Sequence, residues 1–151
     1  MTVVGWTEAY ADEVAAWTYP PPYDFYDLGS DPADAAAMRD PTRWNHHRAV
    51  LGESDRLDAF WYFDWHGQVV EVGIGLRPDL TGRGLGESFM RAQLDYAARS
   101  WHPDTFRLFV TVWNGRAIRL YDRLGFREVG REKRTFERFG EHEFLRMERA
   151  A

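Results

Sequence analysis

Residues 81–86 read Thr81-Gly82-Arg83-Gly84-Leu85-Gly86, and this stretch lies between an extended apolar run and a segment with helical periodicity. Glycines at alternate positions leave backbone N–H groups that no side chain screens. A helix that begins here adds further unpaired N–H groups and the positive end of its dipole. The stretch therefore predicts an anion site, and phosphate or pyrophosphate is the anion that such loops typically bind.

The spacing of this glycine loop argues against two common phosphate sites. The loop lacks the Lys-[Ser/Thr] pair of a P-loop. Its glycines read G-x-G-x-G rather than G-x-G-x-x-G, and no acidic residue follows where a dinucleotide-binding fold needs one. A tight strand-to-helix turn without a ligand is the structural alternative.

The composition is that of a globular domain, and we expect residues 1–151 to form a single one. Hydrophobic residues make up 44% of the 151 residues and charged residues 28%. No apolar stretch approaches the ~20 residues of a membrane span, and residues 1–20 lack a signal-peptide core. The chain has no cysteine, which excludes disulfides, thiolate metal ligands and a cysteine nucleophile. We predict a cytoplasmic protein with no membrane partner.

The charge is unevenly distributed along the chain. Residues 1–67 hold 4 Arg against 12 Asp and Glu, whereas residues 68–151 hold 15 Lys and Arg against 12 Asp and Glu. The second half therefore suits an anionic ligand and the first half a cationic or amine ligand, unless these charges are solvated surface. No basic stripe for nucleic acid, no histidine spacing for a metal and no G-x-S-x-G nucleophile motif is present.

Periodicity and turn residues predict the order β-α-α-β-β-β-α-β-α-β-β, a mixed α/β sheet with a parallel crossover. The expected strands are residues 2–6, 47–51, 57–65, 68–76, 106–113, 126–136 and 141–147, and the expected helices are residues 7–17, 31–39, 85–100 and 116–124. Ala9, Val14 and Trp17 are predicted for the apolar face of the first helix. A tight turn is predicted at His66-Gly67.

Two further blocks narrow the function. Val72–Pro78 precedes the loop, and Asn114–Phe126 reads Asn-Gly-Arg-Ala-Ile-Arg-Leu-Tyr-Asp-Arg-Leu-Gly-Phe. With the loop they resemble the GNAT superfamily of acyl-CoA-dependent N-acyltransferases, in its [Gln/Arg]-x-x-Gly-x-[Gly/Ala] and Asn-x-x-Ala-x-x-Leu-Tyr-x-x-x-Gly-Phe signatures. The resemblance implies a GNAT-like fold with splayed central parallel strands. It also implies transfer of an acetyl group from acetyl-CoA to a primary amine of a small molecule or peptide, by direct attack.

The resemblance also implies which residues bind the acyl-CoA. They are Ile74, Leu76, Thr81, Gly82, Arg83, Gly84, Leu85, Gly86, Asn114 and Tyr121. The backbone of Ile74–Leu76 would pair with the pantetheine arm like an added strand, and an N–H group near Leu76 would polarise the thioester carbonyl. Thr81 departs from the family's Gln or Arg, so a cation–phosphate contact is lost there that Arg83 could supply. Asn114 could instead cap a helix or belong to a turn.

Tyr121 and Glu71 are the candidate catalytic residues. Tyr121 would donate a proton to the departing thiolate, and Glu71 would accept the amine proton directly or through water. The structural alternatives are a packed helix tyrosine and a solvent-facing strand carboxylate. Other candidates for the base are Asp64, His46, His47 and His142, whereas His102 follows a helix end and is expected to be structural or exposed.

The acceptor site is expected from residues 19–45 and from the hairpin at residues 136–143. Its predicted substrate residues are Tyr23, Tyr26 and Trp113; Tyr19 and Trp44 are further candidate walls, and Asp24, Asp27 or Asp31 could attract the amine. Core packing of the rings is the alternative. Two rival functions are a non-catalytic acyl-CoA-binding sensor or scaffold of the same fold and a nucleotide-binding domain of another fold. A homodimer through the C-terminal strands is a further expectation from the resemblance.

Overall fold

The computed structural model describes residues 1–151, with the side chain of Ser30 excepted. The strands are β1 (Thr2–Gly5), β2 (His47–Leu51), β3 (Leu57–His66), β4 (Val69–Leu76), β5 (Thr105–Thr111), β6 (Arg127–Phe136) and β7 (Gly140–Ala150). The α-helices are α1 (Glu8–Ala15), α2 (Pro32–Arg39), α3 (Gly86–Trp101) and α4 (Gly115–Arg123). Short 3₁₀ helices, which the sequence analysis did not predict, lie at Tyr23–Tyr26, Leu28–Ser30, Pro41–His46, Glu53–Asp55 and Pro78–Leu80.

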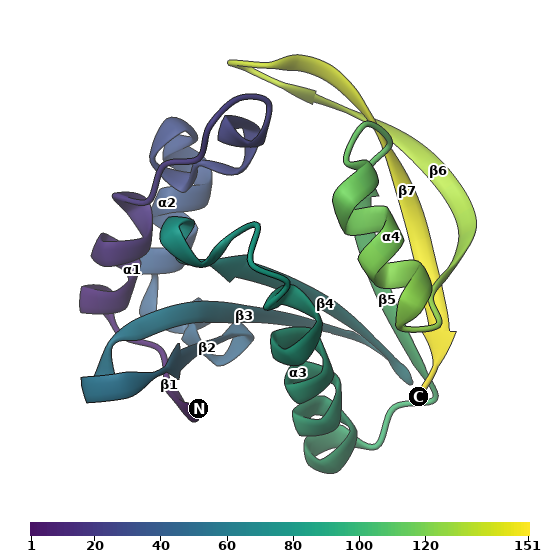
Figure 1. The fold of residues 1–151 in the computed structure, drawn as a ribbon, viewed down its shortest axis with the longest axis horizontal. Coiled ribbons are helices and arrows are strands. Elements are labelled where there is room, and N and C mark those ends of the chain that lie inside the picture. Colours follow the sequence, from purple (N-terminus) through teal and green to yellow (C-terminus); the bar gives the residue numbers. More distant parts are fainter. The chain divides into compact units, whose positions relative to one another are not determined.

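The strands form a seven-stranded mixed sheet in the order β1-β2-β3-β4-β5-β7-β6. β4 and β5 are parallel, and α3 connects them, whereas β1–β2, β2–β3, β5–β7 and β6–β7 are antiparallel. Figure 1 shows β6 and β7 as one long hairpin whose β7 strand runs beside β5. This confirms the predicted mixed α/β sheet and its parallel crossover.

The chain divides into two compact units. One comprises Met1–Tyr62 and Ile74–Arg83, and the other comprises Phe63–Gly73 and Gly84–Ala151. The divisions therefore fall within β3, within β4 and within the glycine loop. The expectation of a single domain stays a prediction.

The first unit has its own core, in which α1 and α2 lie against each other (Figure 1). Its buried residues are Trp6, Ala11, Val14, Trp17, Met38, Ala49, Leu51 and Leu57. Val14 is buried on α1 as predicted, whereas Ala9 is exposed and Ala11 takes its place. Trp17 is buried too, but it lies beyond α1, which ends at Ala15 rather than near Trp17. Positions 11 and 14 share a helix face, whereas position 9 lies on the opposite side.

In the second unit, α3 buries one face, on which apolar residues recur at helical spacing. Phe89, Met90, Leu94 and Ala97 are buried together with Gln93. Alternate residues of β5 (Phe106, Leu108 and Val110) are buried as well. Among the described residues, none of the helices is long and apolar enough to span a bilayer.

The predicted position of the turn between β3 and β4 was wrong. The turn after β3 lies at Gly67-Gln68, one residue later than predicted, because β3 continues through His66. Gly67 has φ 61°, the left-handed conformation that two-residue hairpin turns require. β2 begins at His47 as predicted, directly after the 3₁₀ helix that ends at His46.

Candidate active site

The parallel pairing of β4 with β5 is short. Its register runs from Val69↔Thr105 to Glu71↔Arg107. β5 goes on pairing with β7 up to Thr111↔Phe144. β5 therefore pairs with β7 along its whole length and with β4 only at its beginning. The splay of the two parallel strands stays a prediction.

The C-terminal end of β4 is packed and anchored in the first unit. A Cβ atom at Gly75 would lie 2.1 Å from Cε1 of Phe60, so glycine is required there by the close approach of that ring. The hydroxyl of Tyr19 donates a hydrogen bond of 2.6 Å to the carbonyl of Leu76. The end of the strand is thus held by a side chain from the segment that follows α1.

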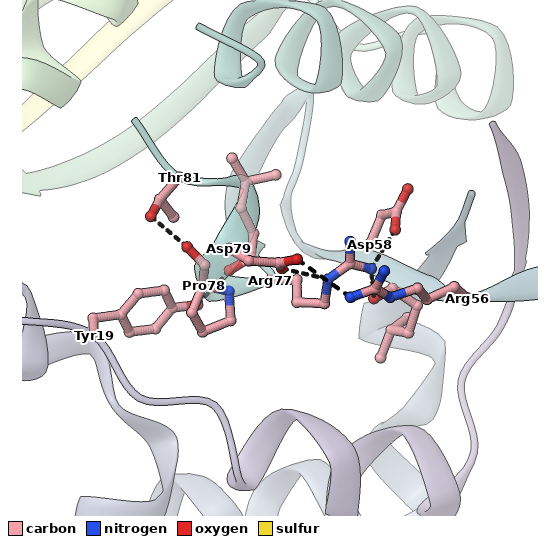
Figure 2. Close-up of polar contacts among 9 residues, drawn as sticks. Tyr19, Arg56, Asp58, Arg77, Pro78, Asp79 and Thr81 are labelled. Carbon is pink, nitrogen blue, oxygen red and sulfur yellow. Dashed lines mark hydrogen bonds and ion pairs between the residues drawn. The ribbon is translucent and has the colours of Figure 1, made fainter. Parts of the chain in front are cut away.

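The residues that follow β4 form a polar network, drawn in Figure 2. The guanidinium of Arg77 donates to Asp58 Oδ1 at 2.6 Å and to Asp79 Oδ1 at 2.5 Å, and its side chain is 14% exposed. Arg56 approaches the other oxygen of Asp79 at 3.2 Å. Because the Arg77 guanidinium is bonded to Asp58 before it in the chain and to Asp79 after it, these contacts fix the path by which the chain enters the glycine loop.

Thr81, the first residue of the loop, is bonded within the chain. Its hydroxyl donates to the carbonyl of Pro78 at 2.6 Å, and its backbone N–H donates to the same oxygen at 3.2 Å (Figure 2). In this conformation the Thr81 hydroxyl donates its hydrogen to Pro78 and not to a phosphate. The expected contact of Thr81 with acyl-CoA stays a prediction, and it would require this bond to open.

The rest of the loop has the backbone form that its glycines predict. Gly82 and Gly84 have φ values of 73° and 72°. Arg83 is exposed and forms no hydrogen bond or ion pair with the residues that the structure describes. Leu85 stands at the N-cap of α3 and supplies no side-chain hydrogen bond, so the first N–H groups of α3 lack a side-chain cap. A Cβ atom at Gly86 would lie 3.1 Å from Cδ2 of Leu120 in α4.

Asn114 and Tyr121 lie at the two ends of α4. Asn114 is buried, and its side-chain oxygen accepts a hydrogen bond of 3.2 Å from the N–H of Ala117, so it is the N-cap of α4. The helix-cap alternative is therefore correct, and a contact of Asn114 with CoA stays a prediction. Tyr121 is half-buried, with its ring centroid 6.2 Å from that of Phe126.

Glu71 lies in a cluster of titratable side chains within the second unit. Nε2 of His66 lies 3.2 Å from Asp64 Oδ2 and 3.9 Å from Glu71 Oε1. Burial raises the pKa of Glu71, and the charge of Asp64 raises it further, whereas His66, Arg134 and Arg107 act in the opposite direction. A carboxylate with a raised pKa in a partly buried position suits a general base.

Two of the three histidines considered as alternative bases, His142 and His47, are engaged elsewhere, and the ring of the third, His46, stacks on Tyr62. Nδ1 of His142 accepts a hydrogen bond of 3.1 Å from the indole of Trp113, and its Nε2 lies 3.0 Å from the carbonyl of Phe139. Both ring nitrogens are thus used. His47 is buried between the rings of Trp6 and Tyr62, and burial lowers its pKa to about 4.

His102 and several of the acceptor candidates have local structural roles. His102 is exposed and ends α3 with φ 49°. Trp44 donates to the carbonyl of Met38 at 3.1 Å. Tyr23 and Tyr26 lie on one 3₁₀ helix, and Tyr26 is 39% exposed. The assignment of Tyr23, Tyr26 and Trp113 to the acceptor stays a prediction.

Asp27 and Asp31 make local backbone contacts. Asp27 accepts a hydrogen bond from the N–H of Tyr19 at 2.9 Å, and Asp31 caps α2. Among the described residues, no group of three or more metal-ligating side chains is placed to hold a metal ion.

With this geometry in place, the comparison with known proteins is decisive. Residues 5–126 match the model of the acetyltransferase (GNAT) family. The chain belongs to the GNAT acetyltransferase family. The motifs that carried the resemblance, the loop at 81–86 and the block that begins at Asn114, fall within the matched region.

Solved structures share the fold of this GNAT member. The dodecameric spermidine N-acetyltransferase from Vibrio cholerae has a TM-score of 0.71 at 18% identity, covering 99% of this chain and 92% of that one. A GNAT-family acetyltransferase from Bacillus anthracis has a TM-score of 0.75 at 13% identity, covering 98% and 93%.

Curated relatives match over a shorter range. Mycothiol acetyltransferases from Clavibacter sepedonicus and Acidimicrobium ferrooxidans are 37% and 38% identical over 75 and 84 residues, about half of this chain. These matches cover only 24% and 27% of the relatives' own lengths.

Proposed function

We propose that this GNAT family member transfers an acetyl group from acetyl-CoA to a primary amine of a small molecule or peptide, by direct attack. The observation that carries the proposal is the glycine loop. It combines positive φ at Gly82 and Gly84 with an unpaired, exposed Arg83 at the beginning of a helix. These features supply backbone N–H donors and one exposed cation for a pyrophosphate.

The acyl arm would bind along β4. Ile74 and Leu76 belong to the part of β4 that lies beyond its register with β5. An extended arm can take backbone hydrogen bonds there as an added strand would. An N–H group near Leu76 would then donate to the thioester oxygen as negative charge develops on it.

The reaction would need one base and one acid. Glu71 accepts a proton from the substrate ammonium, directly or through water, so that the amine nitrogen can attack the thioester carbon. A C–N bond forms and the carbonyl oxygen becomes an oxyanion. When the tetrahedral intermediate collapses, the C–S bond breaks and the thiolate takes a proton from Tyr121. The attacking nitrogen gives up its second proton, which restores the Tyr121 phenol and leaves a neutral amide. The raised pKa of Glu71 supports its part in this scheme.

The acceptor is proposed at the level of a chemical class. The acidic first 67 residues favour a cationic amine, and spermidine, the amine named for the Vibrio cholerae proteins, belongs to that class. The dodecamer of that neighbour makes a homo-oligomer a reasonable expectation for this chain. Cytoplasmic location and the need for acetyl-CoA without a metal are part of the same proposal.

The test is CoA release from acetyl-CoA across a library of polyamines, amino acids, aminoglycosides and peptides, together with calorimetric titration against CoA and ATP. We expect amine-dependent release and a preference for CoA. Arg83→Ala should raise the KM for acetyl-CoA several-fold, whereas Arg99→Ala, which removes an exposed arginine at the far end of α3, should not. CoA binding without release for any amine would instead support the sensor function, and a preference for ATP would overturn the proposal.

A further inference from the structure

Tyr19 occupies an unusual place for a tyrosine in a loop. Its hydroxyl donates to the carbonyl of Leu76 at 2.6 Å although the two residues are 57 positions apart in sequence. The side chain is half-buried, and burial raises the pKa of Tyr19 well above its usual range, with the charge of Asp27 adding to the effect. The hydroxyl therefore stays protonated and keeps donating at any pH at which the protein would work.

The hydrogen bond of Arg77, the residue after Leu76, shows which edge of β4 Tyr19 contacts. The N–H of Arg77 donates to the carbonyl of Asp58 in β3 at 2.8 Å. Neighbouring residues of an extended strand direct their N–H and C=O groups to opposite edges. The C=O and N–H of Leu76 therefore face away from β3, and Tyr19 contacts this outer edge. The peptide group between Leu76 and Arg77 is thus held from both sides, by Tyr19 and by Asp58.

Tyr19 itself is held firmly in the same unit. Two residues before it, Trp17 is 8% exposed and belongs to the core. Its own backbone N–H donates to Asp27 Oδ1 at 2.9 Å. The turn that follows is closed by the N–H of Tyr23, which donates to the carbonyl of Pro20 at 2.9 Å. The hydroxyl is therefore delivered by an anchored segment rather than by a loose side chain.

We infer that Tyr19 is a positioning residue for the acyl donor: by covering the Leu76 carbonyl on the outer edge of β4, it fixes the register in which the donor arm pairs with Ile74 and Leu76. This inference rests on the proposed function. An arm that pairs like a strand needs alternating acceptors and donors along that edge. Because Tyr19 covers the Leu76 carbonyl, the arm can accept a hydrogen bond from the N–H of Leu76 but must donate its own N–H to the carbonyl of Ile74. Without the Tyr19 hydroxyl, the arm can also pair with β4 in a second register, displaced by about two residues or ~7 Å. In that register the thioester lies away from the reacting position.

The test is Tyr19→Phe, which keeps the ring and removes the hydroxyl. Non-productive binding in a second register lowers kcat and the KM for acetyl-CoA together. We expect both to fall by about three- to tenfold, the range of one hydrogen bond, with kcat/KM changed less than threefold. Tyr10→Phe is the matched control, because the Tyr10 hydroxyl has no hydrogen bond among the described residues. It should leave all three parameters unchanged.

Three results would overturn the inference. They are a fall in kcat/KM with an unchanged KM, unchanged kinetics, or the same change in Tyr10→Phe. A titration with acetyl-CoA keeps this test separate from that of the proposed function. If the wild-type protein binds acetyl-CoA without turnover, the proposed reaction fails, while the dissociation constant of Tyr19→Phe still decides the role of Tyr19. Tighter binding supports that role, and equal or weaker binding contradicts it.

Discussion

The Glu71 carboxylate lies 3.9 Å from Nε2 of His66, on the hairpin that joins β3 to β4. His66 also contacts Asp64 at 3.2 Å, so an acidic and a basic side chain of the same hairpin act together on the candidate base. Asp64 raises the pKa of Glu71 and His66 lowers it, so substitutions at these two positions should shift that pKa in opposite directions.

The first prediction concerns the acidic limb of the pH profile of kcat/KM. Glu71 must be deprotonated to act as a base, so activity falls as the pH falls through its pKa. Asp64→Asn removes a charge that raises this pKa and should move the limb to lower pH. His66→Gln removes a charge that lowers this pKa and should move the limb to higher pH. Asp95→Asn, an exposed carboxylate on α3, is the control. Shifts in the same direction, or none, would remove Glu71 from the role of base.

The second prediction separates the activity of Glu71 from its effect on stability. Glu71→Gln should lower kcat by about 10²- to 10⁴-fold. Because the pKa of Glu71 is raised on folding, its protonated form is favoured in the folded state, and stability is lost as the pH rises through that pKa. The variant should therefore have a higher Tm than the wild type at pH 7.5, and the difference should shrink as the pH falls. A lower Tm at pH 7.5 would contradict this account.

The third prediction concerns Tyr121 as the acid. Tyr121→Phe should lower kcat by about 10²-fold or more with little change in the KM for acetyl-CoA, because only the proton donor is removed. The effect should be largest with thioesters whose leaving thiols are most basic. Thiol release at the wild-type rate over the whole amine panel would leave Tyr121 as a packed helix residue.

The fourth prediction concerns stability and not catalysis. His47 is buried, and its pKa falls from 6.5 to about 4 on folding. Since the unfolded chain binds the proton more readily, stability is lost as the pH falls below 6.5, by about 2 kcal/mol between pH 7 and pH 5. Urea unfolding of the wild type and of His47→Phe at both pH values checks this. Equal pH dependence in the two proteins would show that His47 does not contribute.

Much of the fold could be predicted because its boundaries carry strong local signals. Thr7 and Asp31 cap α1 and α2, and Gly125, with φ 93°, follows the end of α4. The 3₁₀ helices were missed because their residues show no periodicity over so short a length. Ala9 was misplaced because a helix as short as α1 has few apolar positions to define its face.

The candidate site was harder to predict because it depends on register and on contacts far apart in sequence. With the turn at Gly67-Gln68, Asp64 lies across the hairpin from Glu71. With the turn one residue earlier, as predicted, Tyr62 would lie across from Glu71 instead. Sequence periodicity could not fix that single residue. Nor could it reveal the bond from Tyr19 to Leu76 or that from Trp113 to His142, since nothing local marks either partner.

The central claim, acetyl transfer from acetyl-CoA to an amine, is tested most directly by the rate of free CoA formation with and without each amine of the library. The account predicts release that depends on a primary amine, saturates with acetyl-CoA and yields one acetylated amine per CoA. Release that no amine accelerates, in protein that binds CoA, would contradict it.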